Sequence, residues 1–356
     1  MRVSDREELL RYYKDELIYL RNRGSAFARQ YPLVAAQLGI GAGESPDPQV
    51  ERLIESFAFL AARIQHELDG EFPEITTALL GNLYPQLVNP IPSMAIAQFH
   101  VDPDQGKLTT GHLIERDTPL TAQTEQEITC RFKTCYPVTL WPLEVVSATF
   151  ESPAQFDFLD SATRILTVLR LKLAPRGVKL SELDLRKLRF YLHGDRMLVN
   201  RLYELLMCHV LSVAVLPDEN APPICLPQDS ISPVGFSLDE DVLPYPPNAH
   251  PGYRLLHEYF TFPEKFMFFE IDNLNRALTG EMLDLLVMLD RPPGNQICID
   301  RETFVLGCTP VINLFRKTTE PIRLDHRQLE YPLIPDKRRE RTTEIHSVIS
   351  VTASSN

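Results

Sequence analysis

A chain of 356 residues, 44% of them hydrophobic and 24% charged, has the composition of an ordinary globular protein and is long enough for two or three domains. Its net charge of −12 repels phosphate backbones and anionic lipid, which argues against nucleic acid or a membrane surface as a partner. The first residues are charged, and the longest apolar run, 205–216, is shorter than the roughly 20 residues of a bilayer span. With only six cysteines, we expect a cytoplasmic protein with reduced thiols and no direct membrane insertion.

The first ninety residues predict a bundle of helices. Ser4 followed by Glu7 forms a capping box, in which each side chain binds a free N–H group at the start of a helix. Apolar and aromatic residues then recur at alternating spacings of three and four, which predicts a seam along one helical face. This first seam consists of Leu10, Tyr13, Leu17, Leu20 and Phe27. We expect Pro32 to end the helix and the glycine-rich stretch 38–43 to form a flexible turn.

A second helix is predicted to begin at Asp47, a favoured N-cap residue, with Pro48 in its first turn. We expect it to stop at Gly70, and a short third helix to run from Pro73 to Pro85. The second helix is apolar nearly all round, so two short neighbours can hardly cover it. Either a partner helix or the rest of the chain must do so, unless the three helices form a private core. Its own seam, the second, consists of Leu53, Phe57, Leu60 and Ile64.

Beyond Pro92 the pattern changes to short runs rich in Val, Ile, Leu and Phe, which predict strands. One helix, 197–208, interrupts them, and the proline-rich and acidic stretch 217–251 is predicted to be a long loop. The 29 prolines suit many short connections better than long parallel βα units. The predicted strands are 94–101, 129–132, 148–151, 165–173, 188–192, 210–216, 265–271, 283–289 and 311–315.

These patterns predict an α+β protein, with an N-terminal helical bundle followed by a β-rich region that has a few helices. We expect a helical partner-binding region at 1–90, a β-rich α+β region at 91–330 and a polar connector at 331–356. The connector carries a basic cluster, 337–341, and a possible strand, 345–351.

No complete catalytic, metal-binding or cofactor motif stands out. Cys130 and Cys135 have the gap of a zinc pair, but no second pair completes a tetrahedral site, and two small strand residues are the favoured interpretation. Cys208 and His209 are neighbours, and neighbours on a helix point in different directions. The glycine-rich turn lacks the Lys-Ser/Thr of a phosphate loop. We therefore expect no catalytic residue, no metal and no cofactor, with an enzyme of unrecognised class as one alternative.

Long motifs spread along the whole chain resemble those of a known family. They are YYKDELIYLR at 12–21, DPQVERLIESFAFLAAR at 47–63, LDGEFP at 68–73, YFTFPEKF at 259–266 and CTPVINLF at 308–315. In this order they resemble the TssF family, which are baseplate proteins of the bacterial type VI secretion system. Members of this family are usually longer, so the resemblance implies that a C-terminal domain is missing here and that the connector leads toward it.

The resemblance implies structural work rather than catalysis. TssF proteins pair with TssG, two TssF copies embracing one TssG, to form a baseplate wedge. Wedges gather with TssK and TssE around the VgrG spike, at the cytoplasmic face of the inner membrane, and support the sheath and the inner tube. We therefore expect both seams to be protein-interaction residues, with TssG and a second TssF copy supplying the opposing helices. A free-standing cytosolic adaptor is the other alternative.

Overall fold

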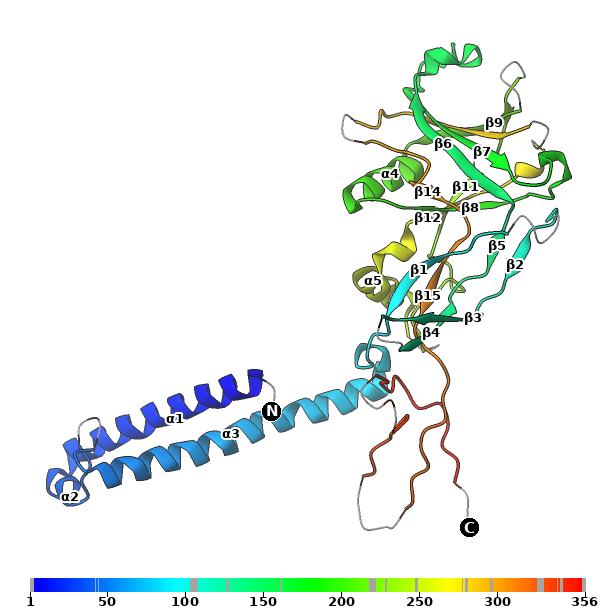
Figure 1. Cartoon of the computed structure of the whole chain (residues 1–356). Helices are drawn as coiled ribbons and strands as arrows, with labels where there is room; N and C mark the ends of the chain where they lie inside the picture. Colours follow the sequence, from blue (N-terminus) through cyan, green and yellow to red (C-terminus); the bar gives the residue numbers. More distant parts are fainter. Residues whose placement is uncertain are drawn as a thin grey trace. The chain divides into compact units, whose positions relative to one another are not determined.

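The chain divides into two compact units, Met1–Asn89 and Pro90–Asn356, in the computed structural model (Figure 1). At 3–7 and 70–74 only the backbone is described, so the predicted Ser4–Glu7 capping box lies outside the described side chains. The described residues are 3–41, 43, 45–102, 108–125, 128–160, 162–217, 222–227, 229–246, 249–276, 278, 281–294, 297–324, 330–337, 339 and 342–353.

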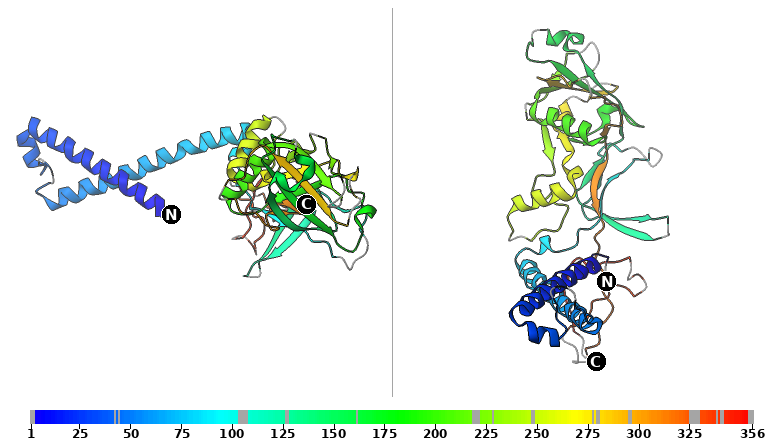
Figure 2. Two further views of the ribbon diagram at one scale, coloured as in Figure 1. Left: turned by 90° about the horizontal axis from the view of Figure 1, so that it is seen from above. Right: turned by 90° about the vertical axis from the view of Figure 1, so that its left-hand side faces the viewer.

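Two long antiparallel helices make the first unit (Figure 1, Figure 2). Asp47 caps the second of them as predicted, because its side chain accepts a hydrogen bond of 2.8 Å from the backbone N–H of Gln49. Pro48 occupies the first turn, where its missing N–H costs nothing. The elements of this unit are α1 (Val3–Gln30), α2 (Pro32–Gln37), α3 (Pro48–Leu83) and the 3-10 turn η1 (Pro85–Leu87).

The predicted stop at Gly70 and the separate helix from Pro73 are wrong, because α3 continues without a break through both. A helix-interior Gly costs about 1 kcal/mol and a Pro about 3 kcal/mol. Packing against α1 offsets these costs. Contacts between the two helices extend to the residue before Gly70, because the Tyr12 hydroxyl donates a 2.7 Å hydrogen bond to Asp69. Pro32, predicted only to end α1, also begins α2, since its fixed φ suits a first helical turn.

Antiparallel strands build the second unit. In chain order they are β1 (Met94–Gln98), β2 (His112–Ile114), β3 (Pro119–Gln123), β4 (Thr129–Thr134), β5 (Val138–Leu140), β6 (Leu143–Glu151), β7 (Thr167–Pro175), β8 (Leu188–Leu192), β9 (Val210–Leu216), β10 (Ile224–Cys225), β11 (Ile231–Val234), β12 (Phe268–Ile271), β13 (Leu283–Leu289), β14 (Phe304–Val305) and β15 (Cys308–Ile312). They form the sheets β1-β15-β4-β3, β10-β9-β13-β7-β6 and β11-β12-β8-β14, and the pair β2-β5. The helices are α4 (Arg196–Cys208), α5 (Pro251–Thr261) and the 3-10 turns η3 (Pro153–Gln155), η4 (Asp157–Leu159), η5 (Leu180–Glu182), η6 (Pro263–Phe266) and η7 (Leu274–Arg276).

The largest hydrophobic core lies around β13, whose residues are all buried between β7 and β9. Three aromatic rings extend this core into the neighbouring four-stranded sheet. Phe190 stacks on Phe269 with ring centroids 5.1 Å apart, and Phe304 meets both rings edge-on. Aromatic pairs in these geometries contribute about 0.5–1.5 kcal/mol beyond the area they bury. The second unit is therefore held by a core of its own.

The predicted α+β class is confirmed, and the strands predicted at 188–192, 210–216 and 283–289 have the observed bounds. The strand predicted from 311 begins earlier, at Cys308. The sequence pattern did not predict this start, because Pro310 donates no ladder hydrogen bond and is unusual within a strand. Its carbonyl still accepts a 2.8 Å hydrogen bond from Cys135, which ties β15 to the end of β4.

Other expectations are corrected by the second unit. The strand predicted at 265–271 begins only at Phe268, because 263–266 form η6. The loop predicted over 217–251 contains β10 and β11, which pair with β9 and β12. Helix α5 was not predicted, and the stretch 345–351 is not a strand. In the described part of the chain, no helix is long and apolar enough to cross a membrane.

The described residues from 330 onward form neither helix nor strand, and the contact division places them within the second unit. Asp336 pairs with Lys317, and Arg339 and Thr342 line a cavity together with Thr129 and Arg131 of β4. Of the basic cluster, Arg338, Glu340 and Arg341 lie outside the described residues.

We expect limited trypsin digestion of the isolated chain to cut first within the basic cluster 337–341. Backbone that lacks ladder or helical hydrogen bonds opens at low cost, and proteases cleave opened chain. Mass spectrometry of the first fragments identifies the site. First cuts inside 94–330 would contradict this view of the connector.

Candidate protein interface

The first seam lies between the two long helices. Tyr13, Leu17 and Leu20 of α1 are half-buried, and they lie on the face of α1 that packs on α3. On the α3 side, Ala58 and Ala62 are both 0% exposed. Small side chains let two helix backbones approach closely, so these alanines form the inner face of α3. The remaining residues of the first seam, Leu10 and Phe27, are 50% and 36% exposed.

The second seam faces away from α1. Leu60 lies two residues from both Ala58 and Ala62, which is about 200° around a helix with 3.6 residues per turn. It therefore points to the opposite side from the buried alanines. The exposed fractions of Leu53, Phe57, Leu60 and Ile64 are 72%, 61%, 55% and 60%. Among the described residues of the first unit, α1 and α2 leave all four of these side chains exposed.

The outward apolar face of α3 is longer than the sequence indicated. Because the helix does not stop at Gly70, the same three-four spacing continues along its second half. At 1.5 Å per residue the resulting stripe is roughly 45 Å long. Monomeric proteins rarely expose contiguous apolar surfaces of this size. The outer stripe of α3, as we call it, consists of Leu53, Phe57, Leu60, Ile64, Leu68, Ile75, Leu79 and Leu83, and the last four are 50–65% exposed.

Polar contacts fix the register of the two helices. Arg21 forms a 2.6 Å ion pair with Glu51, which also accepts a 2.7 Å hydrogen bond from the Ser45 backbone N–H. Both contacts favour the ionised carboxylate and so hold the pKa of Glu51 below its ordinary value. The hydrogen bond from the Ser45 backbone has the larger effect, and the contact with Arg21 comes second. Toward the other end, the hydrogen bond to Asp69 raises the pKa of Tyr12. The hairpin is thus aligned by polar groups, and its apolar stripe is left free.

Glu51→Gln should lower the midpoint of helix unfolding most at neutral pH. A carboxyl group with a depressed folded pKa stabilises the fold above its unfolded pKa, and that stabilisation disappears as pH falls through the folded value. The difference between the variant and the wild type should therefore shrink below about pH 4.3, the ordinary glutamate value. Circular dichroism melts across this range measure it. Glu67→Gln, an exposed position on the same helix, is the control, and a pH-independent difference would contradict the expectation.

The sequence candidates for a metal or nucleophile are not brought together. Cys130 lies within β4 and is half-buried, whereas Cys135 lies in the bend after the strand and is buried, and both are free thiols. Burial raises the pKa of the Cys135 thiol to about 12, which disfavours the thiolate that would bind metal or attack a substrate. His209 pairs with Asp290 at 2.9 Å. Within the described ranges, no group of three His, Cys, Asp or Glu side chains could hold a metal ion.

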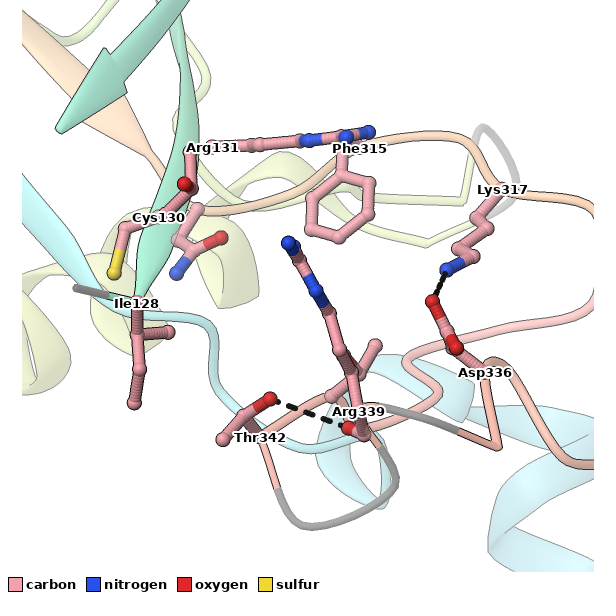
Figure 3. A pocket seen from close by; sticks show the side chains of 11 residues that line it. Ile128, Cys130, Arg131, Phe315, Lys317, Asp336, Arg339 and Thr342 are labelled. Carbon is pink, nitrogen blue, oxygen red and sulfur yellow. Dashed lines mark hydrogen bonds and ion pairs between the residues drawn. The ribbon is translucent and has the colours of Figure 1, made fainter. Parts of the chain in front are cut away.

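A cavity of about 370 Å³ lies between β4 and the C-terminal stretch (Figure 3). Three of its charged side chains contact neighbours: the Arg131 guanidinium lies 5.4 Å from the centre of the Phe315 ring, and Lys317 pairs with Asp336. Cys130 lines the opposite wall with Ile128. No nucleophile with an adjacent base is found among the residues drawn there, so the outer stripe of α3 stays the stronger candidate site.

A hairpin that turns its ionic contacts inward and a long apolar face outward is typical of a subunit of a larger assembly. The chain belongs to the TssF family, because the family model described as Type VI secretion system, TssF matches residues 5–356. This confirms the family that the motifs indicated.

Two similar proteins illustrate this membership. The type VI secretion system component TssF1 of Pseudomonas aeruginosa (strain PAO1) is 39% identical over 353 residues, which are 96% of this chain and 57% of that protein. A chain of the TssK-TssF-TssG baseplate subcomplex, solved by cryo-electron microscopy, superposes with a TM-score of 0.68 at 27% identity. That match covers 83% of this chain and 55% of the other. The chain thus spans little more than half the length of these relatives.

Proposed function

We propose that this chain is a non-enzymatic wedge subunit of the type VI secretion baseplate. Its direct partner in this proposal is TssG, with which it forms a shared helical bundle. Family membership supports the setting, since the similar solved structure is a baseplate subcomplex of TssK, TssF and TssG. In the wider assembly we place a second TssF copy, TssK, TssE, the VgrG spike and the sheath, at the cytoplasmic face of the inner membrane.

The outer stripe of α3 is the observation that carries this proposal. Leaving Leu53, Phe57 and Ile64 each at least 60% exposed forfeits the free energy of burying them, about 25 cal/mol per Å² of apolar area. A private core would have turned these side chains inward, as it does Ala58 and Ala62. A partner helix packed along the stripe recovers that energy. The near-parallel crossing of about 20° that suits three-four spacing is the geometry of a shared bundle.

Co-expression with TssG tests the proposal directly. We expect the two proteins to co-purify, and the mass of the complex to correspond to two copies of this chain for each TssG. The chain expressed alone should bind an apolar dye strongly, because its stripe is uncovered. A chain that is monomeric, well behaved and indifferent to TssG would instead support the free-standing adaptor.

A further inference from the structure

Helix α5 of the second unit buries charged side chains and exposes apolar ones. Arg254 and Glu258, one turn apart on its inner face, are only 4% and 1% exposed. Leu256 and Phe260, on the other face, are 58% and 79% exposed. Surface helices ordinarily bury their apolar stripe and leave charges in water. Figure 1 and Figure 2 show α5 at the periphery of its unit, and the exposure of Leu256 and Phe260 indicates that its apolar face is on the solvent side.

A buried charge cluster holds α5 in this orientation. The guanidinium of Arg254 donates to three backbone carbonyls of 236–238, at 2.8–3.4 Å. Glu258 accepts two backbone N–H groups of 242–243, at 2.7 and 3.1 Å, and pairs with Lys265. Stripping such partners from buried charges costs several kcal/mol. Because rotation of α5 would break all of these contacts, the apolar face is fixed outward.

The exposed face continues beyond the helix as one aromatic patch. The Tyr259 ring lies 5.5 Å from Phe260 and 6.2 Å from Phe266, and Phe266 in turn lies 5.0 Å from Phe236. With aromatic side chains of 150–250 Å² each, the patch exposes on the order of 500 Å². One side of a standard protein interface contributes about 800 Å². The aromatic patch is defined as Phe236, Tyr253, Leu256, Tyr259 and Phe260, which are 46–79% exposed.

The exposed charged side chains that adjoin the patch in the sequence are acidic, and Arg116, which reaches this segment from elsewhere in the chain, is already paired with Asp241 at 2.9 Å. Between 229 and 264 the only Lys or Arg in the sequence is Arg254, and it is buried. The exposed charged side chains of that segment include Asp229, Asp239 and Glu264. A partner with an acidic rim would be repelled there, whereas Lys and Arg side chains would meet both carboxylates and the faces of aromatic rings.

We propose that the aromatic patch docks an amphipathic helix of a partner protein, whose apolar face is flanked by Lys and Arg. Its apolar residues, spaced by three and four, pack on Phe260 and Leu256. Its basic flank contacts Asp239 and Glu264. This surface lies on the second unit, whereas the outer stripe of α3 lies on the first.

The test uses the full chain and two synthetic amphipathic peptides, one of Leu and Lys and one of Leu and Glu in the same pattern. Fluorescence anisotropy should show tighter binding of the Leu–Lys peptide by tenfold or more. Phe260→Ser should weaken that binding about 30-fold, as the loss of a central aromatic contact does. Asp239→Asn with Glu264→Gln should reduce its salt dependence. Hydrogen exchange should show protection at 236–260.

Leu113→Ser removes an apolar side chain that is 50% exposed and lies outside both surfaces, so it is the matched control and should change neither the binding nor the protection at 236–260. Circular dichroism checks that Phe260→Ser stays folded, and Leu256→Ser serves if it does not. Equal binding of both peptides, or binding unaffected by the α5 variants, would overturn the proposal. A concentration-dependent dimer that disappears in Phe260→Ser would overturn it too, because the occupant would then be a second copy. None of these results depends on TssG, so the wedge proposal is tested separately.

Discussion

Phe57→Asp should leave the helical hairpin folded and abolish co-purification with TssG. Phe57 is 61% exposed on the outer stripe, so the new carboxylate stays in water in the isolated chain and costs little. In the complex the same carboxylate would be buried against an apolar partner helix without a counter-charge. Loss of a hot-spot residue costs about 2–4 kcal/mol, which weakens binding about 30- to 700-fold. Circular dichroism and TssG co-purification, read on the same preparations, measure both effects.

Three further variants serve as controls for this result. Ala62→Asp puts a carboxylate at a position that is 0% exposed between α1 and α3, so it should lose helicity as well as TssG. Leu17→Asp, half-buried on the inner face of α1, should behave in the same way. Leu113→Asp changes an apolar residue of the second unit that is 50% exposed, and it should change neither property. If every stripe variant that loses TssG also loses helicity, the stripe is private core and the wedge proposal is wrong.

Lys265→Met should destabilise the second unit by about 3 kcal/mol, the lower end of the range for breaking a buried ion pair. Lys265 is 0% and Glu258 1% exposed, so the substitution leaves a carboxylate buried without its ammonium. The Nε of Arg254, 3.9 Å from Glu258, still neutralises part of that charge, which keeps the cost low in the range. Burial also lowers the pKa of Lys265, an effect that the nearby carboxylate opposes. Urea unfolding followed by the single Trp141, which packs on the largest core cluster, measures the change.

A double variant separates the charge from the packing. Gln at position 258 keeps a carbonyl that accepts the backbone N–H groups of 242–243, and it needs no counter-ion. Glu258→Gln combined with Lys265→Met should therefore recover much of the stability lost in Lys265→Met alone. A single variant that unfolds at the wild-type urea concentration would show that the pair carries no stability. A double variant worse than the single would show that the packing of the two side chains matters more than their charges.

Local patterns were strong enough to predict several elements. The Asp47-Pro48 pair marks a helix start, because capping and a fixed φ act within one turn of chain. The apolar run at 283–289 specifies the fully buried strand β13, since a strand covered on both faces has no polar alternation. Family membership also followed from sequence, because long motifs occur in order along the whole chain. The functions assigned to the three predicted domains stay predictions.

Tertiary contacts decided what the two helical seams do. Both have the same three-four spacing, so periodicity cannot tell which one faces inward. The small side chains of Ala58 and Ala62 let the backbone of α1 approach α3 closely, and this packing leaves Phe57 and Leu60 facing outward. The same packing allows α3 to continue through Gly70, although the low helix propensity of glycine predicts an end there. Helix α5 escaped prediction because its buried face consists of charged residues. Their partners are backbone groups in a loop that only the folded chain brings alongside.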